Sequence, residues 1–136
     1  MSIGIVIATH GLSSVELLKS AEMIAGKQKD VETVTFEEGE GLEELANNYT
    51  CALKKLIHTD NIIILVDLLG GSPFNVAADQ NCEVITGVNI PMLLELFVNR
   101  ENIEADVLVN KLVLATKESI NTLSNVVNVS AEDESF

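Results

Sequence analysis

Apolar strands alternate with amphipathic helical segments along the chain, and this order constrains the fold more than any other feature. Residues 3–8 are almost entirely aliphatic, which predicts a buried strand, and a helical pattern follows up to Gly26. Residues 31–36, 61–67 and 83–88 are the next expected strands, with a helical segment between each pair. Because parallel strands need such crossovers, we predict an α/β fold with helices on both faces of a parallel sheet.

The expected helices cover most of the remaining chain. Residues 42–56 follow the i, i+3, i+4 rule, and residues 90–98 and 104–123 are also predicted to be helical. Another helix should begin with Ser72 as its N-cap and Pro73 at its first position. For a domain of this size we expect the flavodoxin-like strand order 2-1-3-4, whose ligand crevice lies at the carboxyl ends of strands 1 and 3.

The chain has 136 residues, of which 47% are hydrophobic, and this is enough for one domain with a single core. We assign residues 1–130 to that domain and residues 131–136 to an acidic tail. The β-branched run at 125–129 is predicted to be an edge strand.

Charge and apolar content exclude several classes of protein. A net charge of −13 with eight Lys and Arg residues argues against nucleic-acid binding, and suits either solubility or a basic protein partner. No apolar stretch approaches the roughly 20 residues of a membrane helix. The first residues carry no secretory signal, so we expect a cytoplasmic protein. Cys51 and Cys82 lack metal-site spacing and are expected to be reduced thiols.

His10 follows the first strand, and Asp67 ends the third. In the expected strand order these residues are neighbours, and a carboxylate in an apolar run needs a partner. An aspartate that accepts from one imidazole nitrogen fixes the tautomer and leaves the other nitrogen free as base, ligand or nucleophile. His58 is read as a cation near a helix end and receives no role.

Glycines surround this pair in the sequence. Gly11 follows the histidine, and Gly70 and Gly71 precede Ser72 at the start of a helix, so amides and a hydroxyl could hold an anion there. Each feature alone has a structural interpretation, such as a turn, a helix cap or a hydrogen-bonded histidine. Their coincidence at the switch point favours a phosphoryl group carried on the imidazole.

Other chemistries fit these residues less well. Too few His, Cys or carboxylate side chains lie near His10 for a metal site. Ser72 lacks the second glycine of a nucleophile elbow. The chain has neither a dinucleotide fingerprint nor a glycine-lysine pair for nucleotide phosphates. We therefore expect no metal and no cofactor, and a phosphoryl group that arrives on another molecule.

Three stretches, "IGIVIATHGLSSVELLKSAEMIAG", "ILVDLLGGSPFNVA" and "EVITGVNIPMLLEL", closely resemble the enzyme IIA component of the mannose family of the bacterial sugar phosphotransferase system (PTS). The resemblance implies that His10 accepts a phosphoryl group on Nε2 from HPr and passes it to enzyme IIB, which serves the membrane components IIC and IID. It implies that Asp67 orients the ring and that Ser72, with the amides near Gly11 and Gly71, holds the phosphoryl oxygens. It also implies a homodimer that exchanges a carboxyl-terminal strand, here residues 126–129.

Two features depart from the family pattern. Leu68 and Leu69 replace the polar and aromatic residues that can follow the aspartate, so contacts of those side chains are not transferred. The chain has no Ala/Pro linker into a IIB domain, and we expect a separate IIA subunit. Two alternatives remain at this point, a regulatory domain that uses phosphorylation as a signal and a dihydroxyacetone-kinase phosphodonor subunit. The long "DLLGGSPFN" motif favours sugar transport.

Overall fold

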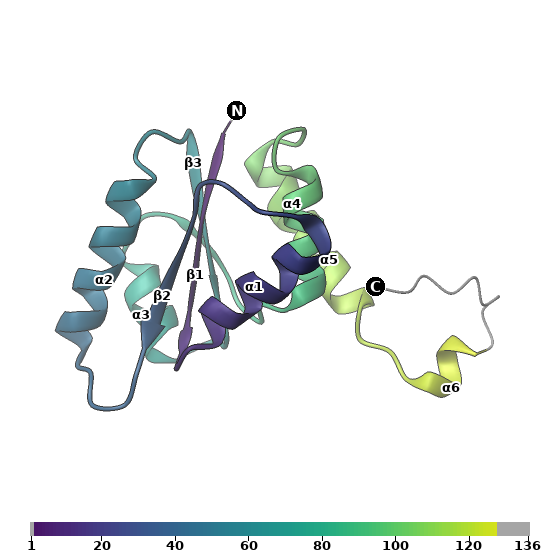
Figure 1. Ribbon diagram of the computed structural model, residues 1–136, viewed down its shortest axis with the longest axis horizontal. Helices are drawn as coiled ribbons and strands as arrows, with labels where there is room; N and C mark the ends of the chain where they lie inside the picture. The colour runs from purple at the N-terminus through teal and green to yellow at the C-terminus, as the bar shows by residue number, and fades with distance from the viewer. Residues whose placement is uncertain (1, 128–136) are drawn as a thin grey trace.

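The computed structural model describes residues 2–127 and has ten elements in that range (Figure 1). In chain order they are β1 (Ile3–His10), α1 (Ser13–Ala25), β2 (Val31–Phe36), α2 (Leu42–Lys55), β3 (Asn61–Val66), α3 (Ser72–Ala78), β4 (Glu83–Ile85), α4 (Ile90–Asn99), α5 (Ala105–Glu118) and α6 (Leu123–Val126).

The four strands form one parallel sheet in the order β2-β1-β3-β4, which confirms the predicted topology. In the register of β1 with β2, His10 lies opposite Phe36. In the register of β1 with β3, Ala8 lies opposite Val66, so Asp67 follows directly beside the end of β1. The switch in chain direction therefore falls where His10 and Asp67 emerge from the sheet.

Helices cover both faces of the sheet, as expected. The pair α2 and α3 lies on one face, and α1, α4 and α5 lie on the other (Figure 1). Alternate residues of β1 serve the two faces: Ile5 and Ile7 join one core cluster, and Val6 and Ala8 join the other. All four side chains are fully buried, so β1 is a rigid central strand that holds its last residue, His10, in place.

The start of α3 differs by one residue from the prediction. Gly71, rather than Ser72, is the N-cap: its backbone is extended (φ −77°, ψ 169°), and its carbonyl accepts a hydrogen bond from the Asn75 amide at 2.9 Å. Both residue types suit an N-cap, so the sequence alone does not select between them. Space beside His10 restricts position 71 to glycine, because a Cβ there would lie 2.9 Å from Cε1 of His10.

In the single chain, residues 125–127 do not form the predicted edge strand at 125–129. Asn125 and Val126 belong to α6, where the Thr122 hydroxyl caps the turn by accepting from the Asn125 amide at 3.3 Å. This helix lies away from the sheet in the single chain (Figure 1), so the sheet offers these residues no neighbouring strand. Residues 128–129 and the acidic tail lie outside the described residues.

The strand β4 is also shorter than predicted, since it ends at Ile85 rather than at residue 88. Gly87 has a positive φ of 79°, which interrupts the regular strand. Its amide still donates to the Asp67 carbonyl at 3.2 Å, and the Val88 amide donates to the Val66 carbonyl at 3.1 Å.

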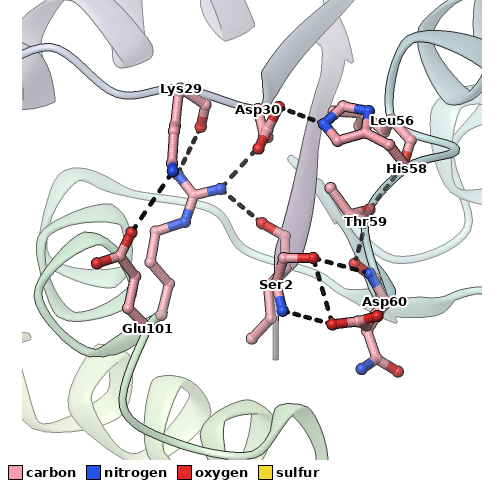
Figure 2. A network of polar contacts seen from close by, with 11 residues as sticks. Ser2, Lys29, Asp30, Leu56, His58, Thr59, Asp60 and Glu101 are labelled. Atoms are coloured by element: carbon pink, nitrogen blue, oxygen red, sulfur yellow. Dashed lines mark hydrogen bonds and ion pairs between the residues drawn. The ribbon is translucent and has the colours of Figure 1, made fainter.

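Polar side chains connect the loops at the amino-terminal ends of the strands, which is the end of the sheet opposite His10. Arg100 is 6% exposed, and its guanidinium donates to the carbonyls of Ile3 (2.5 Å) and Lys29 (2.8 Å). Around it, Lys29 pairs with Glu101, Asp30 with His58 and Ser2 with Asp60 (Figure 2). His58 thus lies 2.9 Å from the Asp30 carboxylate at this edge, far from His10 along the sheet.

Candidate functional site

His10 and Asp67 form the hydrogen-bonded pair that the topology predicts. The Asp67 Oδ2 atom lies 2.8 Å from His10 Nδ1 and accepts from the His10 backbone amide at 3.0 Å. The other carboxylate oxygen, Oδ1, accepts from the Leu68 amide at 3.0 Å. One aspartate thus holds both the backbone and the ring of His10.

The hydrogen bonds also set the charge of Asp67. Partial burial acts to raise the pKa of this carboxyl, but the backbone and ring N–H groups of His10 outweigh burial and bring its pKa below the ordinary value. An ionised Asp67 accepts a hydrogen bond from a protonated Nδ1, so the lone pair of the neutral ring resides on Nε2. The His10 side chain is 46% exposed, so a partner can reach it.

Two neighbours fix the plane of the His10 ring. The Phe36 ring contacts it edge to face, with centroids 5.9 Å apart and planes at 68°. On another side is Gly71, where a built Cβ would lie 2.9 Å from Cε1 and 3.6 Å from Nε2 of His10. The imidazole therefore has a defined orientation, and the absence of a side chain at Gly71 leaves the room that it needs.

The predicted phosphate-binding residues have distinct surroundings. Gly71 and Ser72 open α3 beside the His10 ring, and in the described part of the chain the Ser72 hydroxyl has no hydrogen-bond partner. Gly11 has a positive φ of 60° and open space around its Cα. Its amide, however, donates to the Phe36 carbonyl at 2.8 Å, so this N–H is already engaged.

The junction between β1 and α1 contains two polar residues that the sequence analysis did not select. Thr9 and Ser14 are fully buried, and the Ser14 amide donates to the Thr9 hydroxyl at 2.7 Å. The Ser14 hydroxyl donates to the Val34 carbonyl at 3.0 Å. These bonds fix the turn that carries His10. The sequence signal that could have identified these two residues is a pair of hydroxyl side chains on either side of the expected strand-to-helix turn.

Metal and membrane features are absent from the described range. Residues 2–127 contain no group of three or more His, Cys, Asp or Glu side chains placed to hold a metal ion. None of the helices in that range is long and apolar enough to cross a bilayer. Cys51 and Cys82 are free thiols, as predicted.

Comparison with known proteins identifies the family of the chain. A family model described as "PTS system fructose IIA component" matches residues 4–113. A PTS system mannose-specific EIIAB component from Escherichia coli (strain K12) is 46% identical over 75% of this chain, which spans 33% of that protein. A PTS system fructose-specific EIIA component from Bacillus subtilis (strain 168) is 35% identical, over 90% of this chain and 87% of the relative.

Solved structures agree with the sequence relatives. The crystal structure of phosphotransferase system component EIIA from Streptococcus agalactiae superposes with a TM-score of 0.80 at 33% identity, and the match covers 90% of this chain and 98% of that one. The family model, the sequence relatives and the shared fold thus place the chain in a class of phosphotransfer proteins. The chain is a member of the mannose, fructose and sorbose family of PTS EIIA components.

Proposed function

We propose that His10 is the phosphoryl acceptor and donor of this EIIA component, taking the group from HPr and passing it to enzyme IIB. The observation that carries the proposal is the 2.8 Å contact between His10 Nδ1 and Asp67 Oδ2, because it directs the Nε2 lone pair outward. The family membership supplies the phosphotransfer role. The specific residue and its partners are the proposal.

The step is an in-line exchange between two nitrogens. The Nε2 lone pair of His10 forms a bond to phosphorus while the bond from phosphorus to the donor's histidine breaks, and the donor nitrogen keeps that electron pair. With Nδ1 still protonated, the phosphorylated ring carries a positive charge. Ionised Asp67 lies 2.8 Å from that nitrogen, so its proposed role is to orient the ring and to stabilise this charge.

The phosphoryl oxygens are proposed to bind at the start of α3. Gly71 borders the ring, and it is followed by Ser72, whose hydroxyl has no hydrogen-bond partner among residues 2–127. Because the Gly11 amide is engaged by Phe36, the proposed part of Gly11 is to keep space free beside the ring, where nothing lies within 4 Å of a built Cβ. Neither a metal nor a nucleotide takes part in this scheme.

A homodimer that exchanges carboxyl-terminal strands is also proposed. The strand β4 is at an edge of the sheet, and a hollow of about 460 Å³ beside it is lined in part by Phe74, Ile85 and Val113. The α6 side chains Leu123 and Val126 are 79% and 50% exposed. An apolar segment from a second copy would cover such an edge. The protein would work in the cytoplasm, with IIB and, through it, IIC and IID.

The chain has two histidines, which gives the test of the phosphoryl site an internal control. The EIIA protein is incubated with enzyme I, HPr and phosphoenolpyruvate, and the acid-labile phosphate bound to the EIIA protein is measured. Wild type and His58→Ala should be phosphorylated, and His10→Ala should not. Phosphate on the His10→Ala protein would refute the assignment.

The dimer has a separate test. Sedimentation of a chain truncated after Ser124 should give a monomer where the full chain gives a dimer. Two dimeric samples would rule out the exchanged segment as the basis of assembly, and a monomeric full chain would refute the dimer itself.

A further inference from the structure

Tyr49 is a buried phenol with no part in the scheme above. It is the only tyrosine of the chain, it projects from α2, and it is 0% exposed. Its ring packs in the core cluster that includes Val6, Ala8 and Val66, beneath the carboxyl end of the sheet. Burial and the negative charge of Asp67 both raise the pKa of this phenol, so it stays protonated and remains a hydrogen-bond donor.

The Tyr49 hydroxyl donates to the Pro73 carbonyl at 2.7 Å. Pro73 lies in the first turn of α3, two residues after Gly71. Among the described residues, the other hydrogen bonds of segment 68–75 join that segment to itself or to Asp67, or continue α3. The Tyr49 bond is therefore the polar connection between this segment and a separate element, α2.

The position of this segment controls the surroundings of His10. A Cβ built on Gly71 would overlap Cε1 of the ring at 2.9 Å, so the Gly71 backbone is a wall of the imidazole site. A shift of a few tenths of an ångström at the start of α3 would alter this wall. Phosphoryl transfer is sensitive to displacements of that size, because catalysis consists mainly of positioning.

We propose that Tyr49 is a positioning residue for phosphoryl transfer, whose hydroxyl fixes the first turn of α3 so that Gly71 and Ser72 keep their places beside His10. This inference rests on the proposed function, since it requires His10 to be the acceptor. A tyrosine that only fills the core would act through its ring, and its hydroxyl would have no kinetic effect.

The Tyr49→Phe variant separates these roles, because it keeps the ring and removes the hydroxyl. Phosphoramidate is the donor, so that no partner protein has to dock: Nε2 of His10 bonds to phosphorus, the nitrogen-phosphorus bond of the donor breaks, and ammonia leaves. We expect the phosphorylation rate at saturating donor to fall about five- to tenfold, with little change in the half-saturating concentration.

The matched control is Thr59→Val. It removes a hydroxyl that donates to the Leu56 carbonyl at 2.6 Å, at the opposite edge of the sheet. We expect this variant to react at the wild-type rate. A Tyr49→Phe protein that also reacts at the wild-type rate would overturn the inference, as would equal losses in both variants.

A second measurement needs no substitution at Tyr49. Because the chain has one tyrosine, growth with 3-fluorotyrosine introduces a single fluorine probe. We expect its NMR resonance to shift when wild type is phosphorylated, and to stay in place in His10→Ala treated in the same way. Phosphorylated wild type with an unmoved resonance overturns the positioning role alone, whereas wild type that gains no phosphate on His10 overturns the proposed function as well.

Discussion

Substituting Gly71 by alanine tests whether the space beside His10 is needed for transfer. The backbone of Gly71 (φ −77°) is open to alanine, so the substitution adds no backbone strain. The added Cβ would lie 2.9 Å from Cε1 of His10, against an ordinary carbon contact of about 3.5 Å, so the ring must move by roughly 0.5 Å.

The expected kinetic cost follows from that displacement. A misplacement of about 1 Å can slow a positioned reaction roughly 100-fold, so half of it predicts about a tenfold loss, near 1.4 kcal/mol in the barrier. The assay is the initial rate of phosphoryl transfer from phosphorylated HPr. We expect the free energy of unfolding to change by less than about 1 kcal/mol, because the backbone is compatible with alanine.

The chain provides a matched control in Gly41. This glycine is the N-cap of α2, with a similar extended backbone (φ −96°, ψ 171°), and a Cβ there would meet nothing within 4 Å. Gly41→Ala should therefore transfer at the wild-type rate. If Gly71→Ala did so too, the steric argument would be refuted, and equal losses in both variants would assign the effect to N-cap chemistry.

Two further predictions concern the charged residues. Asp67→Asn should slow transfer at least tenfold. Because the pKa of Asp67 is depressed in the folded protein, the stabilisation from its charge is present above about pH 4 and is lost as the pH falls through the folded pKa. The difference in free energy of unfolding between wild type and Asp67→Asn should therefore shrink in acid. A constant difference from neutral pH to acid would contradict this. Arg100→Leu should lower the free energy of unfolding by about 3 kcal/mol in urea titrations, because the buried Ile3 carbonyl and the partly buried Lys29 carbonyl lose their donor. A loss below about 1 kcal/mol would contradict this prediction.

The sheet and the histidine-aspartate pair could be predicted because both follow from local pattern and chain order. Continuous aliphatic runs identified β1 and β3, and the expected strand order brought His10 beside Asp67 without any knowledge of side-chain contacts. The position of Phe36 beside His10 could have been predicted in the same way. It ends the strand that pairs with β1, and the register places it opposite His10.

Features that depend on long-range geometry were not predictable from the sequence. Tyr49 reads as one more apolar position of an amphipathic helix, and only the packing of α2 against α3 shows that its hydroxyl reaches the Pro73 carbonyl. The engagement of the Gly11 amide by Phe36 was likewise not visible. The run at 125–129 is β-branched, but its conformation depends on whether another strand is available to pair with it.

The most direct test of the central claim locates the phosphate on the ring. The protein, labelled with nitrogen-15 in its two histidines, is phosphorylated through HPr and its imidazole nitrogens are observed by NMR. We expect Nε2 of His10 to show coupling to phosphorus, Nδ1 to keep its proton toward Asp67, and His58 to be unchanged. Phosphate on Nδ1 of His10, or on any other residue, would contradict it.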